Sequence, residues 1–122
     1  MIYLFVFILL LIPVVRFDLM QIEKGRQLWL FLCWSVLVLV AGLRYRVGGD
    51  TLIYMVWFDT YPTWDDLSYF NFEEAKFNPL WYIFNALTKS IVDDFAFFQI
   101  VHAVIVNSVF FYFFKKYTPY YF

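Results

Sequence analysis

The stretch FAFFQIVHAVIVNSVFFYFF, residues 95–114, contains twenty residues and is followed directly by Lys115 and Lys116. A helix that crosses a lipid bilayer needs ~20 consecutive, mostly apolar residues, and this stretch meets that requirement. Three other apolar stretches, each shorter or interrupted by polar residues, occur at residues 1–15, 28–43 and 79–92. We therefore predict a single all-α domain, a multi-pass bundle of about four transmembrane helices.

The composition also indicates a membrane protein. Of the 122 residues, 64% are apolar and 26% are aromatic, with a mean hydropathy of +0.69, whereas soluble domains are closer to half apolar. The 9 basic and 10 acidic residues nearly cancel, and no basic tract suggests nucleic-acid binding. Cys33 and His102 are single residues of their types, which excludes an internal disulfide and argues against a Cys/His metal site. We expect the lipid bilayer as a partner, and no nucleic acid, metal or cofactor.

Local signals mark where some of the apolar helices begin. Residues 1–15 lack a basic leader and a small-residue cleavage site, so we interpret them as a retained anchor and not as a signal peptide. Asn78 and Pro79 are typical of an N-cap and a first helical residue. Asp94 is placed to cap the last helix.

Residues 44–78 form the only long hydrophilic segment of the sequence. A helix is predicted at residues 51–61, with Asp50 in position for its N-cap. A second short helix is predicted from Thr63, with Asp66 as its capping-box partner. Because both helices are rich in aromatic residues, we expect a re-entrant or interfacial loop with amphipathic helices.

Possible chemistry is concentrated directly after the second apolar stretch. Arg44 and Arg46 offer planar donor groups that bind phosphate well. Gly48 and Gly49 allow the backbone to approach a ligand closely, and Asp50 can accept a proton. A structural interpretation stands beside this one: the arginines anchor a helix at the interface, the glycines form a turn, and Asp50 caps a helix or pairs with Arg46.

An aromatic stripe follows the glycines. Tyr54, Phe58 and Tyr61 share one face of the predicted helix, at spacings of four and three residues. The pattern favours packing at the membrane interface over direct contact with a substrate.

The distribution of charge gives only a small bias to the orientation. Five Lys and Arg residues fall on one side of the predicted topology and three on the other, and Lys89 near a helix end is assigned to neither. The five are Arg44, Arg46, Lys76, Lys115 and Lys116, and the three are Arg16, Lys24 and Arg26. The positive-inside rule would place residues 44–78 in the cytoplasm. Arginines that are kept outside to bind an anionic substrate would make that rule misleading here.

The segment GLRYRVGGDT, residues 42–51, followed by Tyr54 and Phe58, resembles the signature of the EpsG family of membrane proteins. These are Wzy-like proteins of bacterial exopolysaccharide and O-antigen assembly. The similarity continues in order and spacing through residues 78–81, 98–100 and 114–117. The chain departs from the family pattern at Gly49, where a small polar residue is common. It departs again at residues 78–80, where a Glu-Pro-Gly-like turn is common, so no carboxylate is expected to act at that turn.

The resemblance implies a glycosyltransferase-type polymerase of the bacterial inner membrane, acting in exopolysaccharide, O-antigen or capsule synthesis. It would join repeat units carried on undecaprenyl diphosphate at the outer face of that membrane. Arg44 and Arg46, with Gly48 and Gly49, would hold the diphosphate, and Arg44 and Arg46 would stabilise its departure. Asp50 would act as general base or orient an arginine.

Two further expectations follow from the resemblance. Tyr54 would line the substrate cavity. Family proteins contain several more membrane helices, so this chain is expected to be an N-terminal fragment that is inactive alone.

Two other functions are compatible with the sequence. The protein could be a non-enzymatic subunit that assembles with other polysaccharide assembly proteins. It could also belong to a small transporter in which Asn85, Lys89, His102 and Asn107 line a path. The structural interpretation of these residues is hydrogen bonding between helices, with Lys89 extending to the nearby interface.

Overall fold

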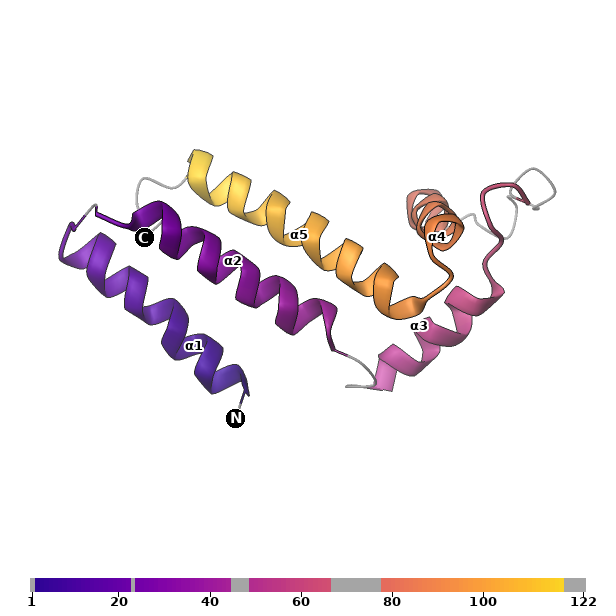
Figure 1. Ribbon diagram of the computed structural model, residues 1–122, viewed down its shortest axis with the longest axis horizontal. Helices are drawn as coiled ribbons and strands as arrows, with labels where there is room; N and C mark the ends of the chain where they lie inside the picture. The colour runs from indigo at the N-terminus through magenta and orange to yellow at the C-terminus, as the bar shows by residue number, and fades with distance from the viewer. Residues whose placement is uncertain (1, 23, 45–48, 67–77, 118–122) are drawn as a thin grey trace. The chain divides into compact units, whose positions relative to one another are not determined.

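The computed structural model describes residues 2–22, 24–44, 49–66 and 78–117. Within these ranges the chain forms five α-helices and one π-helix, and no strand (Figure 1): α1 (Ile2–Pro13), η1 (Val14–Leu19), α2 (Arg26–Gly42), α3 (Gly49–Thr60), α4 (Pro79–Ile91) and α5 (Phe95–Tyr117). The predicted all-helical class is therefore confirmed for the described residues. The four predicted apolar helices all occur, and their ends differ from the predicted ones by a few residues.

The first apolar stretch changes its hydrogen-bonding pattern after Pro13. The proline keeps helical dihedral angles, φ −65° and ψ −35°, but it has no N–H to donate to the helical ladder. The chain then continues as η1, and the N–H of Met20 donates to the carbonyl of Val15 at 3.0 Å. A wider turn of this kind keeps the backbone bonded through a shift in helical register. The helical backbone thus extends to Leu19.

The chain divides into two compact units, which we describe separately. The first unit contains Met1–Ala41 and Ala103–Phe122. Within it, α1 and α2 lie side by side and run in opposite directions (Figure 1). Gly25 takes a φ of +88° in the connection between them, a conformation that favours glycine. Arg26 Nη2 lies 3.8 Å from Asp18 Oδ1 at that same end.

The second unit is Gly42–His102. It contains α3, α4 and the start of α5, and therefore most of the residues with possible chemistry. Its core consists of buried Phe58, Phe95 and Phe98, against which Met55, Trp81 and Phe84 pack. One residue from α3 and two from α5 thus form a common aromatic centre.

Helix α5 is long and apolar enough to cross a membrane. Its 23 residues correspond to about 34 Å at 1.5 Å per residue, and the hydrocarbon core is ~30 Å thick. Only 11% of its most apolar window is buried inside the structure, whereas the core helix of a soluble protein is mostly covered. Among the described helices, α5 alone meets the criterion for length and composition, and α2 is a shorter apolar helix. One span is therefore supported by the structure.

Two predicted helix starts are observed. Asp94 Oδ1 accepts hydrogen bonds from the N–H groups of Ala96 at 2.6 Å and Phe97 at 3.3 Å, as expected for the N-cap of α5. Asn78 is the N-cap of α4 and Pro79 is its first residue, but the Asn78 side chain makes no capping hydrogen bond. Its carbonyl oxygen instead accepts the N–H of Tyr82 at 3.1 Å.

Two predictions for the long hydrophilic segment are wrong. Helix α3 begins at Gly49, so Asp50 lies inside its first turn and is not its N-cap. The described residues from Thr63 to Asp66 form a turn and not a helix. The Thr63 hydroxyl donates directly to Asp66 Oδ2 at 2.8 Å, so these two side chains bond to each other instead of capping main-chain N–H groups. The part of this prediction that falls on residues 67–77 lies outside the described residues.

The capping bonds of Asp94 predict a measurable loss of stability. Replacing Asp94 with alanine should lower the free energy of unfolding by about 1 kcal/mol, because two N–H groups at the start of α5 lose their acceptor. Asp94→Asn is the matched control, since its amide oxygen can still accept. Reversible unfolding in mixed detergent micelles, followed by circular dichroism, measures the difference. An equal loss in both variants would show that capping is not the cause.

Candidate functional site

Helix α3 carries the predicted site residues that follow the glycine pair. Asp50 lies in its first turn and is exposed. A carboxylate in that position is stabilised by the partial positive charge of the helix N-terminus. Tyr54 follows four residues later, on the same side of the helix, and 44% of its surface is exposed. The two side chains therefore present a carboxylate and an aromatic ring on one accessible face.

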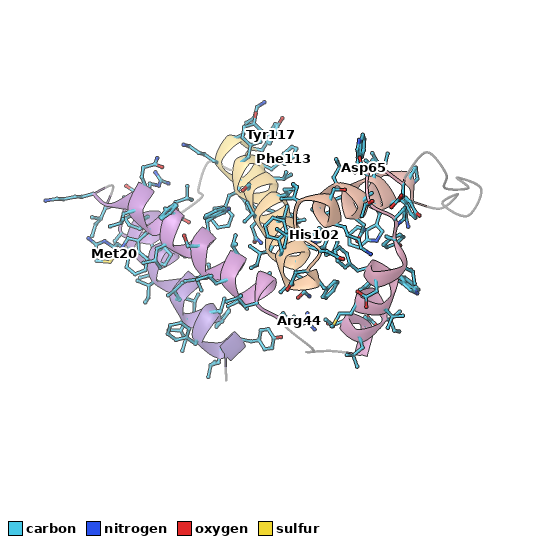
Figure 2. All side chains as sticks on the ribbon, turned by 45° about the vertical axis from the view of Figure 1, so that its right-hand side comes forward. Met20, Arg44, Asp65, His102, Phe113 and Tyr117 are labelled. Carbon is cyan, nitrogen blue, oxygen red and sulfur yellow. The ribbon has the colours of Figure 1, made fainter. Side chains whose placement is uncertain are left out.

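Arg44 follows the end of α2 and is exposed (Figure 2). Its main-chain carbonyl accepts a hydrogen bond of 3.4 Å from Gln99 Nε2 on α5. This bond joins two positions that are 55 residues apart in the sequence. A hydrogen bond from α5 therefore helps to hold the backbone at Arg44, which carries the guanidinium group.

The structure describes only part of the predicted site. Arg46 and Gly48 lie outside the described residues, and Gly49 is described as the first residue of α3. Asp50 and Tyr54 both lie on α3, one helical turn apart. The assignment of catalytic and substrate-binding roles to these residues stays a prediction.

Tyr54 is held by contacts between aromatic edges and faces. Its ring centroid lies 5.7 Å from that of Trp57, at an interplanar angle of 82°. It lies 6.2 Å from Trp81 on α4, at 62°. Such T-shaped pairs are favourable arrangements of aromatic rings. They fix the position of the ring while leaving much of its surface accessible.

The other two residues of the aromatic stripe have different surroundings. Phe58 is only 1% exposed, and its ring lies 5.8 Å from Phe95 and 5.3 Å from Phe98. Tyr61 packs edge to face against Tyr82 of α4 at 4.8 Å. Phe58 is therefore a core residue that packs against other protein side chains, and packing of the stripe at the membrane interface stays a prediction. The start of α5, distant in sequence, covers this side of α3.

Lys89 of α4 has a role that sequence reasoning missed. Its Nζ donates to the main-chain carbonyl oxygens of Phe58 at 3.2 Å, Asp59 at 2.9 Å and Tyr61 at 2.9 Å. The side chain is 10% exposed, so it does not extend to the nearby interface as expected. The ammonium instead binds the C-terminal end of α3. A cation at a helix C-terminus is a favourable arrangement, but nothing in the local sequence indicates which helix it would serve.

The other three polar residues named for a transport path are bonded within their own helices or packed among rings. Asn85 is 1% exposed, and its Nδ2 donates to the carbonyl of Trp81 at 2.7 Å. Asn107 Nδ2 donates to the carbonyl of Ala103 at 2.8 Å. The His102 ring contacts Trp81 edge to face at 5.5 Å. These contacts favour structural roles over a polar pathway.

The described residues also give a first view of possible ligand sites. Within that part of the chain, no three His, Cys, Asp or Glu residues lie close enough together to hold a metal ion.

In the first unit, a pocket of about 380 Å³ lies between α2 and α5 and is lined by Gln27, Leu30, Phe31, Trp34, Ser108 and Phe111. Its lining is mainly apolar and carries no charged group.

Comparison with known proteins identifies the family. The family model described as the EpsG family matches residues 26–122. No curated protein and no solved structure matches the chain. The matched region contains α2, α3, α4 and α5, and with them the arginine- and glycine-bearing segment. Because this match covers well over half of the 122 residues, the chain belongs to the EpsG family of polysaccharide-related membrane proteins.

Proposed function

We propose that this protein is a membrane polysaccharide polymerase that joins repeat units carried on undecaprenyl diphosphate. The products would be exopolysaccharide, O-antigen or capsule chains. The observation that carries the proposal is the EpsG family match over residues 26–122. In each cycle, an acceptor sugar hydroxyl would form a bond to the anomeric carbon of the donor chain. The bond from that carbon to undecaprenyl diphosphate would break, and the hydroxyl proton would pass to a base.

The proposal includes a multi-pass arrangement in the bacterial cytoplasmic membrane. The four spans would be α1 with η1, α2, α4 and α5, and α3 would lie at the interface. Apolar side chains that face outward support this arrangement. On α1, Tyr3, Leu4, Phe5 and Phe7 are each at least 59% exposed, and lipid is the solvent that favours such a surface.

The diphosphate would bind at the junction between α2 and α3. Arg44 is exposed there, and its guanidinium can donate two parallel hydrogen bonds to phosphate oxygens. Arg46, Gly48 and Gly49 follow within five residues, and the N-terminus of α3 begins at Gly49. Main-chain N–H groups at a helix N-terminus bind phosphate oxygens. Arginine and N–H groups together would stabilise the charge that develops on the departing diphosphate.

Asp50 would act as the general base. It is exposed in the first turn of α3, so an acceptor hydroxyl can reach its carboxylate. Tyr54 lies one helical turn away on the same side, and its accessible ring could stack on a sugar of the acceptor. The proximity of base and stacking ring would orient the hydroxyl toward the donor carbon.

The arginines provide the first test. Arg44→Ala or Arg46→Ala in the whole protein should abolish polymer, while single repeat units accumulate on the lipid carrier, because the diphosphate loses its charged donors. Arg44→Lys keeps a positive charge but loses the planar donor pair, so it should recover only part of the activity. Polysaccharide length on gels and lipid-linked units by mass spectrometry are the readouts.

Lys115→Ala is the matched control, since it removes an exposed charge near the end of α5. It should leave chain length unchanged. Normal polymer in both arginine variants would remove the proposed substrate role and favour a non-enzymatic subunit.

The base is tested by Asp50→Asn. Asparagine keeps the size of the side chain and removes both its negative charge and its ability to take a proton. The polymerisation rate should fall by about 10²–10⁴-fold, the usual contribution of a general base. Asp59→Asn makes the same change in charge near the other end of α3 and should retain activity. A fully active Asp50→Asn variant would leave the carboxylate without a catalytic role.

The orientation of the site can be measured by thiol labelling. In a Cys33→Ala background, Asp66→Cys should react with a membrane-impermeant maleimide in intact spheroplasts, because the proposed donor is used outside the cytoplasm. Lys24→Cys lies in the connection before α2 and should react only after lysis, since one span separates the two positions. Labelling in the reverse order would place the arginines in the cytoplasm and exclude the proposed reaction.

A further inference from the structure

We propose that Lys89 is a positioning residue: it fixes α3 on α4 and thereby holds Asp50 and Tyr54 in their working places. This inference rests on the proposed function, since it concerns the geometry of the same site. No part of the family signature quoted above includes Lys89. The contacts of its ammonium group carry the inference.

The geometry matches the donors of Lys89 to the acceptors of α3. A lysine ammonium has three N–H donors, and Lys89 Nζ contacts three carbonyl oxygens at 2.9–3.2 Å. The last carbonyls of any α-helix lack partners within the helix. Phe58 and Asp59 belong to the last turn of α3, which ends at Thr60, and Tyr61 follows it. Lys89 thus caps a helix that lies about 30 residues earlier in the chain.

The surroundings of the ammonium keep it at this position. Nζ lies 5.5 Å from the centroid of the Phe58 ring, within the range of a cation–π contact. Asp93 Oδ1 lies 3.9 Å away, but the Asp93 side chain is 71% exposed, so this ion pair contributes little. The partly buried ammonium would therefore lose most of its compensation if α3 moved away.

Aromatic packing alone does not fix α3 in this way. Ring contacts around Phe58 tolerate small rotations and shifts, because hydrophobic attraction has little direction. Hydrogen bonds to the carbonyls of Phe58, Asp59 and Tyr61 specify both the rotation and the axial position of the helix end. A helix of 12 residues is a rod of about 18 Å. Fixing its C-terminal end therefore also directs its N-terminal end, where Asp50 lies.

A nearby hydrogen bond shows where a disulfide could link the chain after α3 to α4. The rate at which that disulfide forms would report whether the two segments stay together. The N–H of Trp64 donates to Ser90 Oγ on α4 at 2.7 Å. Positions 64 and 90 are therefore close enough for a pair of cysteines to report whether the chain after α3 stays on α4. This readout does not depend on polymerisation.

The central experiment replaces Lys89 with methionine, which keeps an unbranched apolar side chain and removes the ammonium. The polymerisation rate should fall by about tenfold or more, because a displacement of about 1 Å at a distant support can cost 10²-fold in rate. In Cys33→Ala, Trp64→Cys, Ser90→Cys protein, the rate of disulfide formation should fall in parallel. Lys89→Arg should recover part of both signals, and Lys115→Met should change neither.

Chemical rescue separates the ammonium from general damage to the fold. Lys89→Ala removes the atoms of n-propylammonium, and with them the ammonium donors to the carbonyl groups of Phe58, Asp59 and Tyr61. Added n-propylammonium should restore both polymerisation and disulfide formation, whereas tetramethylammonium, which has no N–H donors, should restore neither.

The outcomes distinguish this proposal from the proposed function. Unchanged disulfide formation in Lys89→Met would overturn the fixing of α3 by Lys89. Reduced disulfide formation with normal polymerisation would overturn its link to the site. If Arg44→Ala and Asp50→Asn retain full activity, the proposed function itself fails, whatever the Lys89 variants show.

Discussion

The hydrogen bonds from the Lys89 ammonium to three carbonyl groups at the end of α3 are the contact on which the second unit depends. The last carbonyl groups of a helix lack partners in the next turn and take hydrogen bonds from other donors. Lys89 supplies donors from α4, through a side chain that is itself only 10% exposed. Charge-assisted hydrogen bonds of this kind contribute about 1.5–3 kcal/mol each, so they are comparable in size to the packing around them.

The aromatic packing around Phe58 and the hydrogen bonds of Lys89 stabilise the second unit in different ways. Truncation of a buried phenylalanine such as Phe58 to alanine costs about 3–5 kcal/mol in soluble proteins. Phe58 contacts Phe95 and Phe98 from α5, which gives the unit cohesion between helices. The lysine adds direction, because its bonds select one rotation of α3 among those that the rings would allow. Exposed Tyr54 and Asp50 gain a defined position from both.

The helices themselves were predictable because their signals are local. Apolar runs of suitable length mark α2, α4 and α5, and Asp94 caps the helix that directly follows it. The π-helix after Pro13 was not predictable, since an apolar run has the same appearance in either helical form. Asp50 was predicted as the N-cap but lies in the first turn of α3, because aspartate is favoured in both places. The contact of Lys89 with α3 joins residues 28–31 positions apart, and no sequence pattern specifies that pairing.

The charges at the two ends of α3 affect how strongly the proposed site would attract an anion. Asp50 lies at the positive end of the helix and Lys89 at the negative end, so a side chain of suitable charge already offsets the dipole at each end. The helix N-terminus alone therefore offers less attraction to a diphosphate than a helix without an acidic first turn. Guanidinium groups must then supply most of the binding, and Arg44 is exposed beside this segment. In the proposed reaction the arginines would hold the leaving group, which leaves the Asp50 carboxylate available for the acceptor hydroxyl.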